Sequence, residues 1–381
     1  MEFRPADAAQ LILGAARVLA ASMATVGVAL SAGCDRGSPA PGGAANSSNH
    51  APDSIAHALL VSVDGLRPEC LEPPLLEQLP AFARLLRGPH TLDARTDPDY
   101  TITLPNHLSM LTGRPVLGAS GHAWIGNDDP PGLRQGGTVH ALRGAYVASA
   151  FDVAHDAGLV TAAIASKTKF WLLEQSYSDT FGAPDTLAPD HGKAKIDRFV
   201  TARSMDDVAR ATLWHLETAP GRSFGFVHFA APDAAGHADG WLVEPTSRYF
   251  AAVMETDRAL GRLLDGLDRN PALRGRVAIV LTADHGGGVP LKTHTEKSSG
   301  LNFRIPFLVW LGSDRAPSDL AAANPSRPRP DPAANPPFDG APAPIRNGDA
   351  GNAALQLLGL PSIPESSYGR LWPLTVPTDR P

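Results

Sequence analysis

Acidic and histidine side chains recur in this sequence just after short apolar runs. The runs that they follow or adjoin are HALLVSV, SFGFVHFA, RVAIVLTA and RIPFLVW. The six side chains are Asp64, Asp233, His237, Asp284, His285 and His294. Each alone is an ordinary turn, cap or polar residue, but three carboxylates and three imidazoles at four such places form a rarer pattern. Mixed nitrogen and oxygen ligands suit zinc and other transition metals, and six ligands suffice for two neighbouring open sites.

A threonine in the stretch TITLPNHLSMLTG supplies a candidate nucleophile. Pro105 favours a helix start at this point, because proline at the first helical position loses no needed N–H. Thr103 therefore stands just before the predicted helix, near the positive end of its dipole. A helix cap would explain this hydroxyl equally well, so its function depends on whether the acidic and histidine residues converge on it.

Alternating short apolar runs and helical periodicities predict the elements that position these residues. Strands are expected over 56–63, 158–166, 223–230, 276–283 and 304–312, and helices over 76–87, 204–217, 245–267 and 348–360. This alternation indicates an α/β fold with a mostly parallel sheet. Ligands of such sheets gather beyond the carboxyl ends of the strands, where the acids and histidines lie. We expect an insertion or cap within 116–203 and a Pro-rich loop over 313–345.

The composition limits the classes of partner. With 381 residues, 43% hydrophobic and 19% charged, the chain suffices for one large core or two ordinary domains. A net charge of −6 gives no basic field of the kind that binds nucleic acid. Cys70 is the single cysteine beyond residue 34, so the mature chain forms no internal disulfide, and we interpret it as a small core residue.

The N-terminal 34 residues have the layout of a signal peptide. Arg4 and Arg17 precede an uncharged stretch too short to span a bilayer, which ends in small residues before Cys34. The sequence LSAGC resembles a bacterial lipoprotein cleavage box, which predicts a lipid-modified Cys34 and a membrane tether. Cleaved secretion and an uncleaved anchor are the alternatives. Residues 35–55 read as a flexible Gly/Pro/Ser linker, and residues 56–375 as the catalytic domain. The predicted location is extracytoplasmic, in the periplasm or cell envelope.

Four motifs resemble the alkaline phosphatase superfamily, and most of all its type I phosphodiesterase/nucleotide pyrophosphatase branch. They are VSVDGLRP, TITLPNHLSMLTGRP, APDAAGHADG and TADHGG, in the family's order. The resemblance implies a three-layer α/β/α sandwich with a central, mostly parallel sheet. It also implies hydrolysis of a small phosphorylated substrate at two Zn²⁺ ions, through a covalent intermediate on a threonine, here Thr103.

Carried over residue by residue, the resemblance assigns two sets of metal ligands. One set is Asp233, His237 and His294, and the other is Asp64, Asp284 and His285 with Thr103 bridging toward phosphorus. Asn127 is the expected ligand of a phosphate oxygen, although it stands a few residues later than the family's spacing. Asn106 competes for that role, but its place at the helix start suggests a structural one. His107 and His122 are interpreted as structural.

Lys167 and Lys169 leave the substrate open. They lie two residues apart just past a predicted strand, and would share a face if extended. They are either solvent-exposed or a substrate-binding pair, similar to the lysines with which phosphonoacetate hydrolases of the superfamily hold a carboxylate. The alternatives to a phosphodiesterase or phosphatase are therefore a carbon–phosphorus bond hydrolase and a non-catalytic lipoprotein that binds metal or a phosphorylated ligand. A sulfatase is disfavoured, because the nucleophile position holds threonine. Neither the oligomeric state nor the natural substrate follows from the sequence.

Overall fold

A computed structural model of the protein describes residues 55–129, 137–185, 192–313, 316–340 and 343–378. The predicted signal peptide, Cys34 and nearly all of the predicted linker lie outside these residues. Within the described part of the chain, no helix combines the length and apolar character needed to cross a membrane.

One mixed sheet carries the fold, with strands in the order β4-β3-β5-β1-β6-β7-β2-β8. The strands are β1 (His57–Val63), β2 (Pro89–Arg95), β3 (Val160–Ala165), β4 (Arg198–Thr201), β5 (Ser223–Phe229), β6 (Val277–Thr282), β7 (Arg304–Trp310) and β8 (Ser318–Asp319). The five strands from β4 to β6 run parallel, whereas β7 is antiparallel to both β6 and β2. Every residue of β1, β5 and β6 is buried, as expected for strands covered on both faces.

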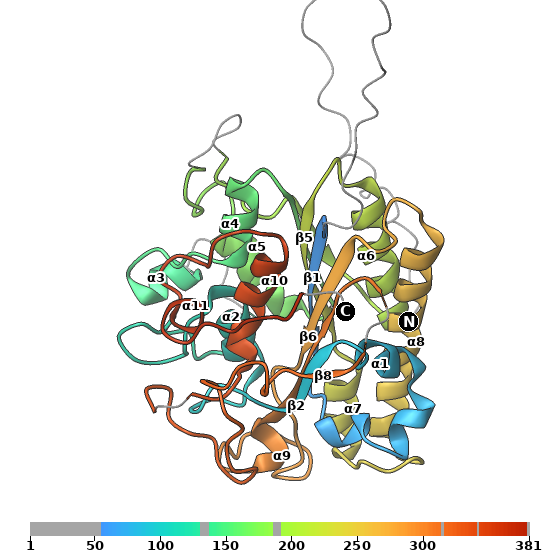
Figure 1. Ribbon diagram of the computed structural model, residues 1–381. Coiled ribbons are helices and arrows are strands. Elements are labelled where there is room, and N and C mark those ends of the chain that lie inside the picture. Colours follow the sequence, from blue (N-terminus) through green and yellow to red (C-terminus); the bar gives the residue numbers. More distant parts are fainter. Residues whose placement is uncertain (1–54, 130–136, 186–191, 314–315, 341–342, 379–381) are drawn as a thin grey trace, which may run out of the picture. The chain divides into compact units, whose positions relative to one another are not determined.

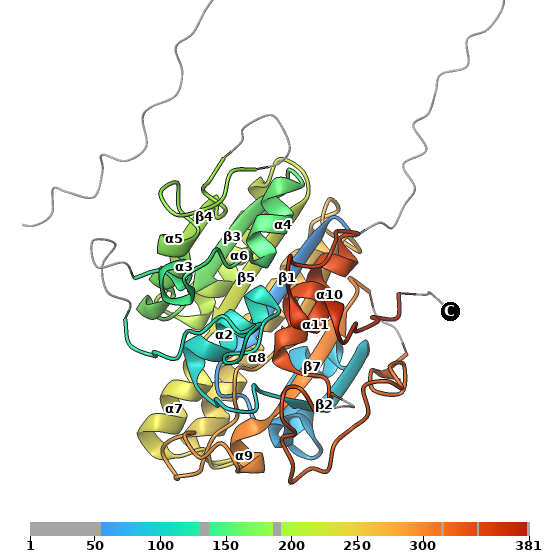
Figure 2. The same cartoon turned by 90° about the vertical axis from the view of Figure 1, so that its left-hand side faces the viewer.

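Helices cover the two faces of the sheet and complete a three-layer α/β/α sandwich (Figures 1 and 2). One layer holds α1 (Pro80–Leu85), α6 (Met205–Thr218), α7 (Ala231–Asp239) and α8 (Arg248–Arg269). The other holds α2 (Thr103–Thr112), α4 (Ala150–Asp156) and α10 (Ala350–Leu357). The shorter helices are α3 (Val139–Arg143), α5 (Trp171–Ser176), α9 (Gly300–Phe303) and α11 (Ser367–Arg370). The predicted fold class is thereby confirmed.

Helix α2, which carries the candidate nucleophile, has well-defined ends. It begins at Thr103 itself, one residue earlier than the sequence predicts, with Ile102 as the extended N-cap residue. It ends at Gly113, whose φ of +63° is the left-handed conformation that glycine adopts without a Cβ penalty. All ten residues of α2 are buried, so the helix holds Thr103 rigidly against the sheet.

The expected strands are all present, and the main differences lie in the segment 116–203. We expect an insertion or cap there beside the predicted strand 158–166, which is β3, but the segment also supplies a second strand of the sheet, β4. Strand β4 pairs in parallel with β3, which in turn pairs with β5. In the Pro-rich loop 313–345 the described residues form one short strand, β8, and the loop is anchored by the buried Arg327. Cys70 is a buried free cysteine, as the sequence suggests.

Candidate active site

The strand order brings the predicted acidic residues to one edge of the sheet. Strand β1 lies between β5 and β6, and all three run parallel, so their carboxyl ends are neighbours. Asp64 directly follows β1, and Asp284 lies two residues after β6. Asp233 lies in the first turn of α7, which follows β5. The fourth parallel strand, β3, ends two residues before Lys167. Charged side chains from four adjacent strands therefore meet at this edge.

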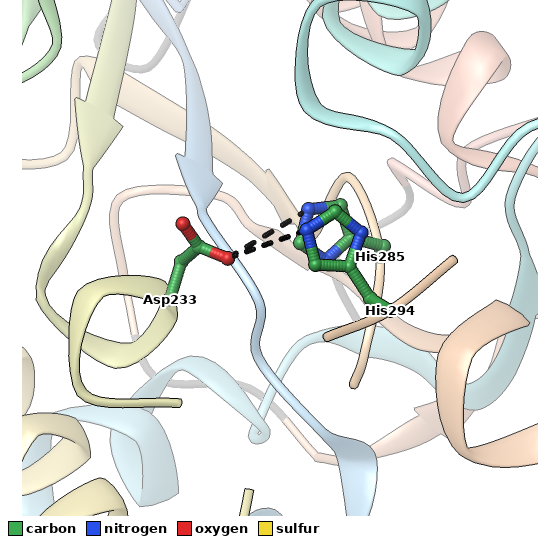
Figure 3. A group of neighbouring side chains, drawn as sticks. All are labelled: Asp233, His285 and His294. Carbon is green, nitrogen blue, oxygen red and sulfur yellow. Dashed lines mark ion pairs between the residues drawn. The ribbon is translucent and has the colours of Figure 1, made fainter. Parts of the chain in front are cut away.

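Three groups of described side chains have the spacing of metal ligands, with ligand atoms within 4.8 Å of one another, and two of them lie at this edge of the sheet; the third is His155, Asp156 and Asp185. At this edge, one group is Asp64, Asp284 and His285, in which His285 Nε2 lies 3.6 Å from Asp64 Oδ1 and 3.2 Å from Asp284 Oδ2. The other is Asp233, His285 and His294 (Figure 3). Asp233 Oδ1 lies 3.9 Å from His285 Nε2 and 3.8 Å from His294 Nε2. His285 belongs to both groups, so the two lie side by side.

The three predicted histidine ligands share one hydrogen-bonding arrangement. The Nδ1 atoms of His237, His285 and His294 each contact a backbone carbonyl oxygen. These oxygens belong to Lys292, Gly286 and Thr101, at 3.0, 2.8 and 2.5 Å. Because a carbonyl oxygen only accepts, Nδ1 must carry the proton, and the Nε2 lone pair is left for another partner. Metal-bound histidines are oriented in this way. Burial lowers the pKa of His285, and that of His294 to about 2, so both imidazoles are neutral.

Three buried carboxylate oxygens in this cluster lack a hydrogen-bond partner among the described residues. They are Asp64 Oδ1, Asp233 Oδ1 and Asp284 Oδ2, the same atoms that approach the imidazole Nε2 atoms. Burial, and then the neighbouring Asp64 carboxylate, raise the pKa of Asp284 well above its ordinary value. Buried carboxylate oxygens without donors are costly unless a cation compensates them. The donor set and its unpartnered atoms therefore fit divalent metal ions.

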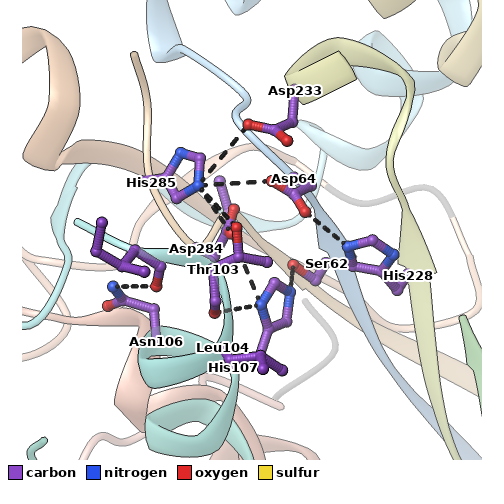
Figure 4. Close-up of polar contacts among 12 residues, drawn as sticks. Ser62, Asp64, Thr103, Leu104, Asn106, His107, His228, Asp233, Asp284 and His285 are labelled. Carbon is purple, nitrogen blue, oxygen red and sulfur yellow. Dashed lines mark hydrogen bonds and ion pairs between the residues drawn. The ribbon is translucent and has the colours of Figure 1, made fainter. Parts of the chain in front are cut away.

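Thr103 places its hydroxyl beside this cluster (Figure 4). Its Oγ1 lies 3.4 Å from His285 Nε2, and the residue is 1% exposed at the start of α2. A hydroxyl next to a metal site and a helix N-terminus is suited to ionise and act as a nucleophile. The arrangement thus combines candidate metal ligands with a rigidly held hydroxyl.

The sequence model of the type I phosphodiesterase/nucleotide pyrophosphatase family matches residues 58–293, which is more than half of the chain. The chain belongs to this family. The match runs from β1 to the residue before His294, and so includes five of the six predicted acidic and histidine ligands and Thr103. No curated protein matches the chain by sequence.

The fold of the chain is similar to that of solved structures from the alkaline phosphatase superfamily. A protein of the alkaline phosphatase superfamily from Vibrio parahaemolyticus is 15% identical, with a TM-score of 0.50 over 80% of this chain and 67% of that one. A Bacteroides thetaiotaomicron protein of glycosaminoglycan metabolism is also 15% identical, with a TM-score of 0.50 over 80% and 73%. Mouse ectonucleotide pyrophosphatase/phosphodiesterase 5 is 22% identical, with a TM-score of 0.40 over 60% of this chain and 57% of that one. At these identities the likeness concerns the fold.

His237 differs from the other histidines of this phosphodiesterase-family site in its exposure. Its Nε2 lies 3.4 Å from Asp233 Oδ1, but 46% of its side chain is exposed, and it belongs to neither close group. The resemblance assigns His285 to the second metal set alone, whereas the structure places it between both groups. The other assigned metal ligands lie within the cluster.

Asn127 lies beside the start of α2, next to the candidate nucleophile. Its side-chain oxygen accepts a hydrogen bond from the Leu104 N–H at 3.1 Å, so the amide stands at the first turn of α2. No other hydrogen bond joins its amide group to the described residues. Asn106, the competing residue, is fully buried and used by the backbone around it: its amide binds the Tyr100 and Ile102 carbonyls and the Asp97 N–H. This is a structural role, as expected.

Lys167 lies closer to the metal ligands than the sequence suggests. Its Nζ donates to Asp64 Oδ2 at 2.7 Å and to Asp233 Oδ2 at 2.6 Å, and so joins two of the expected ligands through the oxygens that face away from His285. Burial opposes its charge, but the two carboxylates raise the pKa of Lys167. Two of its three N–H bonds are thus occupied, and substrate binding by Lys167 stays a prediction.

Lys169 lies on the short turn after Lys167, half-buried. Burial, and then the Lys167 charge, lower the pKa of Lys169. Its ammonium group forms no hydrogen bond or ion pair with the described residues. A turn of 3-10 helix over Thr168–Phe170 replaces the extended chain that the sequence analysis assumed.

Several polar residues of the site escape the sequence motifs. His228, in β5, contacts Asp64 Oδ2 through Nε2 at 2.9 Å, on the other side of that carboxylate from His285 (Figure 4). Its only signal is a histidine inside an otherwise apolar run. His107 joins α2 to β1, because its Nε2 accepts from the Ser62 hydroxyl at 2.7 Å while its Nδ1 donates to the Thr103 carbonyl. His122 is buried and contacts the Pro105 carbonyl. The structural interpretation of His107 and His122 agrees with these contacts.

Proposed function

We propose that this protein is a zinc-dependent hydrolase of phosphate esters, a phosphodiesterase or phosphatase, that acts through a covalent phosphothreonine at Thr103. The observation that carries the proposal is the set of three partnerless carboxylate oxygens and three imidazole Nε2 atoms beside the Thr103 hydroxyl. Membership of the type I phosphodiesterase/nucleotide pyrophosphatase family supports the reaction class.

Each residue has a defined part in this reaction. Asp233, His237 and His294 would hold one zinc ion, and Asp64, Asp284 and His285 the other. Bound zinc would favour the Thr103 alkoxide and neutralise charge on the phosphoryl oxygens. Thr103 Oγ1 attacks phosphorus in line, forming a P–O bond while the bond to the leaving oxygen breaks. Water then cleaves the phosphothreonine, which restores the hydroxyl and releases the phosphoryl product.

The remaining groups hold charge and geometry during these steps. The Asn127 amide and the N–H at the start of α2 would donate to the equatorial oxygens of the phosphoryl group. Lys167 holds the carboxylates of Asp64 and Asp233 at a fixed separation. Lys169 is available to contact a second anionic group of the substrate.

Thr103→Ala tests the nucleophile. We expect the rate of p-nitrophenyl ester hydrolysis to fall by more than about 10³-fold, because no other hydroxyl replaces the covalent step. Zinc content, measured by elemental analysis, should remain close to that of the wild type, since six other ligands remain. Thr103→Ser, which keeps a hydroxyl, should recover part of the rate. Unchanged hydrolysis by Thr103→Ala would contradict the mechanism.

A panel of substrates distinguishes the proposed ester hydrolase from the alternative functions. The half-buried ammonium group of Lys169, which has no partner among the described residues, favours one second candidate, a carbon–phosphorus bond hydrolase whose lysine binds a substrate carboxylate. Bis-p-nitrophenyl phosphate, p-nitrophenyl phosphate and phosphonoacetate should be compared at equal zinc loading. Turnover of the esters supports our proposal, whereas turnover of phosphonoacetate alone supports the second candidate. Zinc binding without turnover of any compound would indicate a non-catalytic binding protein.

We further propose that the protein works outside the cytoplasm, tethered to a membrane through a lipid on Cys34. The LSAGC sequence and the linker-like composition after it support this location. Cys34→Ser should move the protein from the membrane fraction to the soluble fraction of cells, and retention in the membrane would argue against the lipid.

A further inference from the structure

Trp241 is a large buried side chain that contacts two of the candidate metal ligands, His237 and His294. It belongs to none of the sequence motifs. It follows α7 by two residues and is 2% exposed. Its ring fills space that two glycines leave open. A Cβ at Gly236 or at Gly287 would lie 2.2 Å from the indole ring. Gly236 lies one residue before His237, and Gly287 two residues after His285, so the ring is wedged between the two segments that carry these ligands.

The indole is also fixed to the segment that carries Asp64. Its Nε1–H donates to the Gly65 carbonyl at 3.1 Å, and the Tyr249 hydroxyl donates to the same oxygen at 2.8 Å. The backbone carbonyl of Trp241 accepts from Arg67 at 3.1 Å. Gly65 has a φ of +71°, and its N–H donates to Asp284 Oδ1. The orientation of the indole is therefore set by hydrogen bonds as well as by packing.

The ring contacts two of the proposed zinc ligands directly. Its centroid lies 5.1 Å from that of His237 at an interplanar angle of 77°, and 5.8 Å from that of His294 at 75°. Both are edge contacts, which are favourable between aromatic rings. The two imidazoles also contact each other, with centroids 5.1 Å apart. The side chain of His237 is 46% exposed, and Trp241 is a buried surface against which its ring packs.

We propose that Trp241 is a positioning residue for the zinc ion of Asp233, His237 and His294, because it holds the two imidazoles at the angle that binding requires. The inference rests on the proposed function only in naming the ion. Groups that orient metal ligands typically change metal affinity by about 10–100-fold when they are removed. An aromatic ring in contact with two ligands at once should act in the same range.

The first test compares Trp241→Ala with Trp241→Phe by zinc titration against a chromophoric chelator. Trp241→Ala should weaken zinc binding by about tenfold or more at one of the two sites. Trp241→Phe keeps most of the ring and should recover most of the affinity. Trp310→Ala is the matched control, because Trp310 is equally buried but pairs with Ile279, away from the end of β6 that leads to Asp284. It should lower stability and leave zinc affinity unchanged. Zinc affinity of a folded Trp241→Ala within about twofold of the wild type would overturn the proposal.

A second test leaves the tryptophan in place. Gly236→Ala forces a Cβ against the indole and should weaken zinc binding as Trp241→Ala does. Gly261→Ala is its control, since Gly261 is also helical and its Cβ would meet only Ala81 at 3.9 Å. Unchanged zinc affinity of Gly236→Ala would count against the proposal, and this comparison remains available if Trp241→Ala does not fold.

Tryptophan fluorescence gives a readout independent of catalysis. Co²⁺ bound by His237 and His294 should quench Trp241, so Trp241→Phe should lose most of the quenching seen in the wild type. Equal quenching in both proteins would contradict the position of Trp241 beside the metal bound by His237 and His294, and would overturn the proposal. The proposed function fails separately: if zinc binds as predicted but no phosphate ester is hydrolysed, the role of Trp241 stands and the activity does not.

Discussion

At the scale of single residues, the site holds three buried carboxylates whose charges are only partly balanced by the ammonium group of Lys167. Asp64, Asp233 and Asp284 are all buried within one cluster, and Lys167 bonds to only two of them. Burial alone would raise the pKa of Asp64, but Lys167 and His228 lower it well below its ordinary value. Among the described residues Asp284 accepts only the Gly65 N–H, and burial and then the Asp64 carboxylate raise its pKa. Without a bound cation, the charge of Asp284 is therefore costlier to the fold than that of Asp64.

Asp284→Asn should separate stability from metal binding. Because the folded state raises the pKa of Asp284, its ionisation above the ordinary carboxyl pKa opposes folding, and a neutral amide removes this cost. In chelator-treated protein at pH 7, the free energy of unfolding should rise, since the amide carries no charge in the buried cluster. Zinc affinity should fall at least about tenfold, because a ligand oxygen loses its charge.

Asp257→Asn is the matched control for that substitution. Asp257 lies in α8, 3% exposed, where burial raises its pKa to about 6 and its Oδ1 accepts from the Phe82 N–H at 2.9 Å. It should also stabilise the metal-free protein at pH 7, but leave zinc affinity unchanged. Urea unfolding and zinc titration measure the two quantities. A gain of zinc affinity in Asp284→Asn would contradict the assignment of this carboxylate as a ligand.

At the scale of elements, the sequence predicts the strands that are buried and apolar. It does not predict the elements whose formation depends on contacts with distant segments. Strands β1, β5 and β6 are largely apolar runs. The sequence therefore predicts both these strands and the residues that follow their ends. Strand β2 contains the polar run HTLDAR and is only partly buried, so it gives no apolar signal. Helix α7 coincides with a motif that was interpreted only as a source of ligands.

The contacts of side chains could not be derived from spacing. The sequence leaves Lys167 either solvent-exposed or substrate-binding, because nothing in it shows that β3 lies next to β5. That strand order places its ammonium group between Asp64 and Asp233. Trp241 and His228 were missed for the same reason: their roles depend on neighbours from distant segments.

A pH-dependent ion cluster joins α4 to the segments after it. His155 Nδ1 lies 2.9 Å from Asp185 Oδ2, and its Nε2 lies 3.6 Å from Asp197 Oδ1. The hydrogen bond to Asp197 chiefly raises the pKa of His155, to about 9, although burial opposes it. Lys195 also faces the cluster, through Asp156 and Asp185, and its pKa is raised. The cluster is thus held together by cations of two kinds, of which the imidazolium loses its proton at the lower pH.

The stability of the protein should therefore fall as the pH rises from 6.5 to above 9. A raised pKa means that the charged imidazolium stabilises the fold fully below its unfolded pKa of about 6.5, and that this contribution is lost as the pH passes the folded pKa. His155→Gln should show a smaller decrease of the urea midpoint between pH 6.5 and 9.5 than the wild type. Equal decreases in the two proteins would contradict the assignment.

At the scale of the whole described domain, the site connects segments that are far apart in the sequence. Its proposed ligands come from the end of β1, from α7, from the end of β6 and from the loop before β7, a span from Asp64 to His294. These segments adjoin the central strands of the sheet, and each of the three carboxylates has one oxygen without a donor among the described residues, so the carboxylates repel one another without a cation. Metal ions that bind the folded chain alone must therefore stabilise the domain as a unit.

Removal of metal should accordingly lower the unfolding temperature of the entire domain in a single transition. At a free zinc concentration of 100 times the dissociation constant, binding at one site adds about 2.7 kcal/mol to the free energy of unfolding. Calorimetry of zinc-loaded and chelator-treated protein should show this difference as a shift of several degrees, larger at higher free zinc. His294→Ala should show a reduced shift, because the variant loses a buried ligand, whereas His90→Gln, at a partly exposed position in β2, should keep it. Identical unfolding temperatures with and without zinc would mean that the cluster does not bind the metal, since any ion held by these side chains must favour the folded chain.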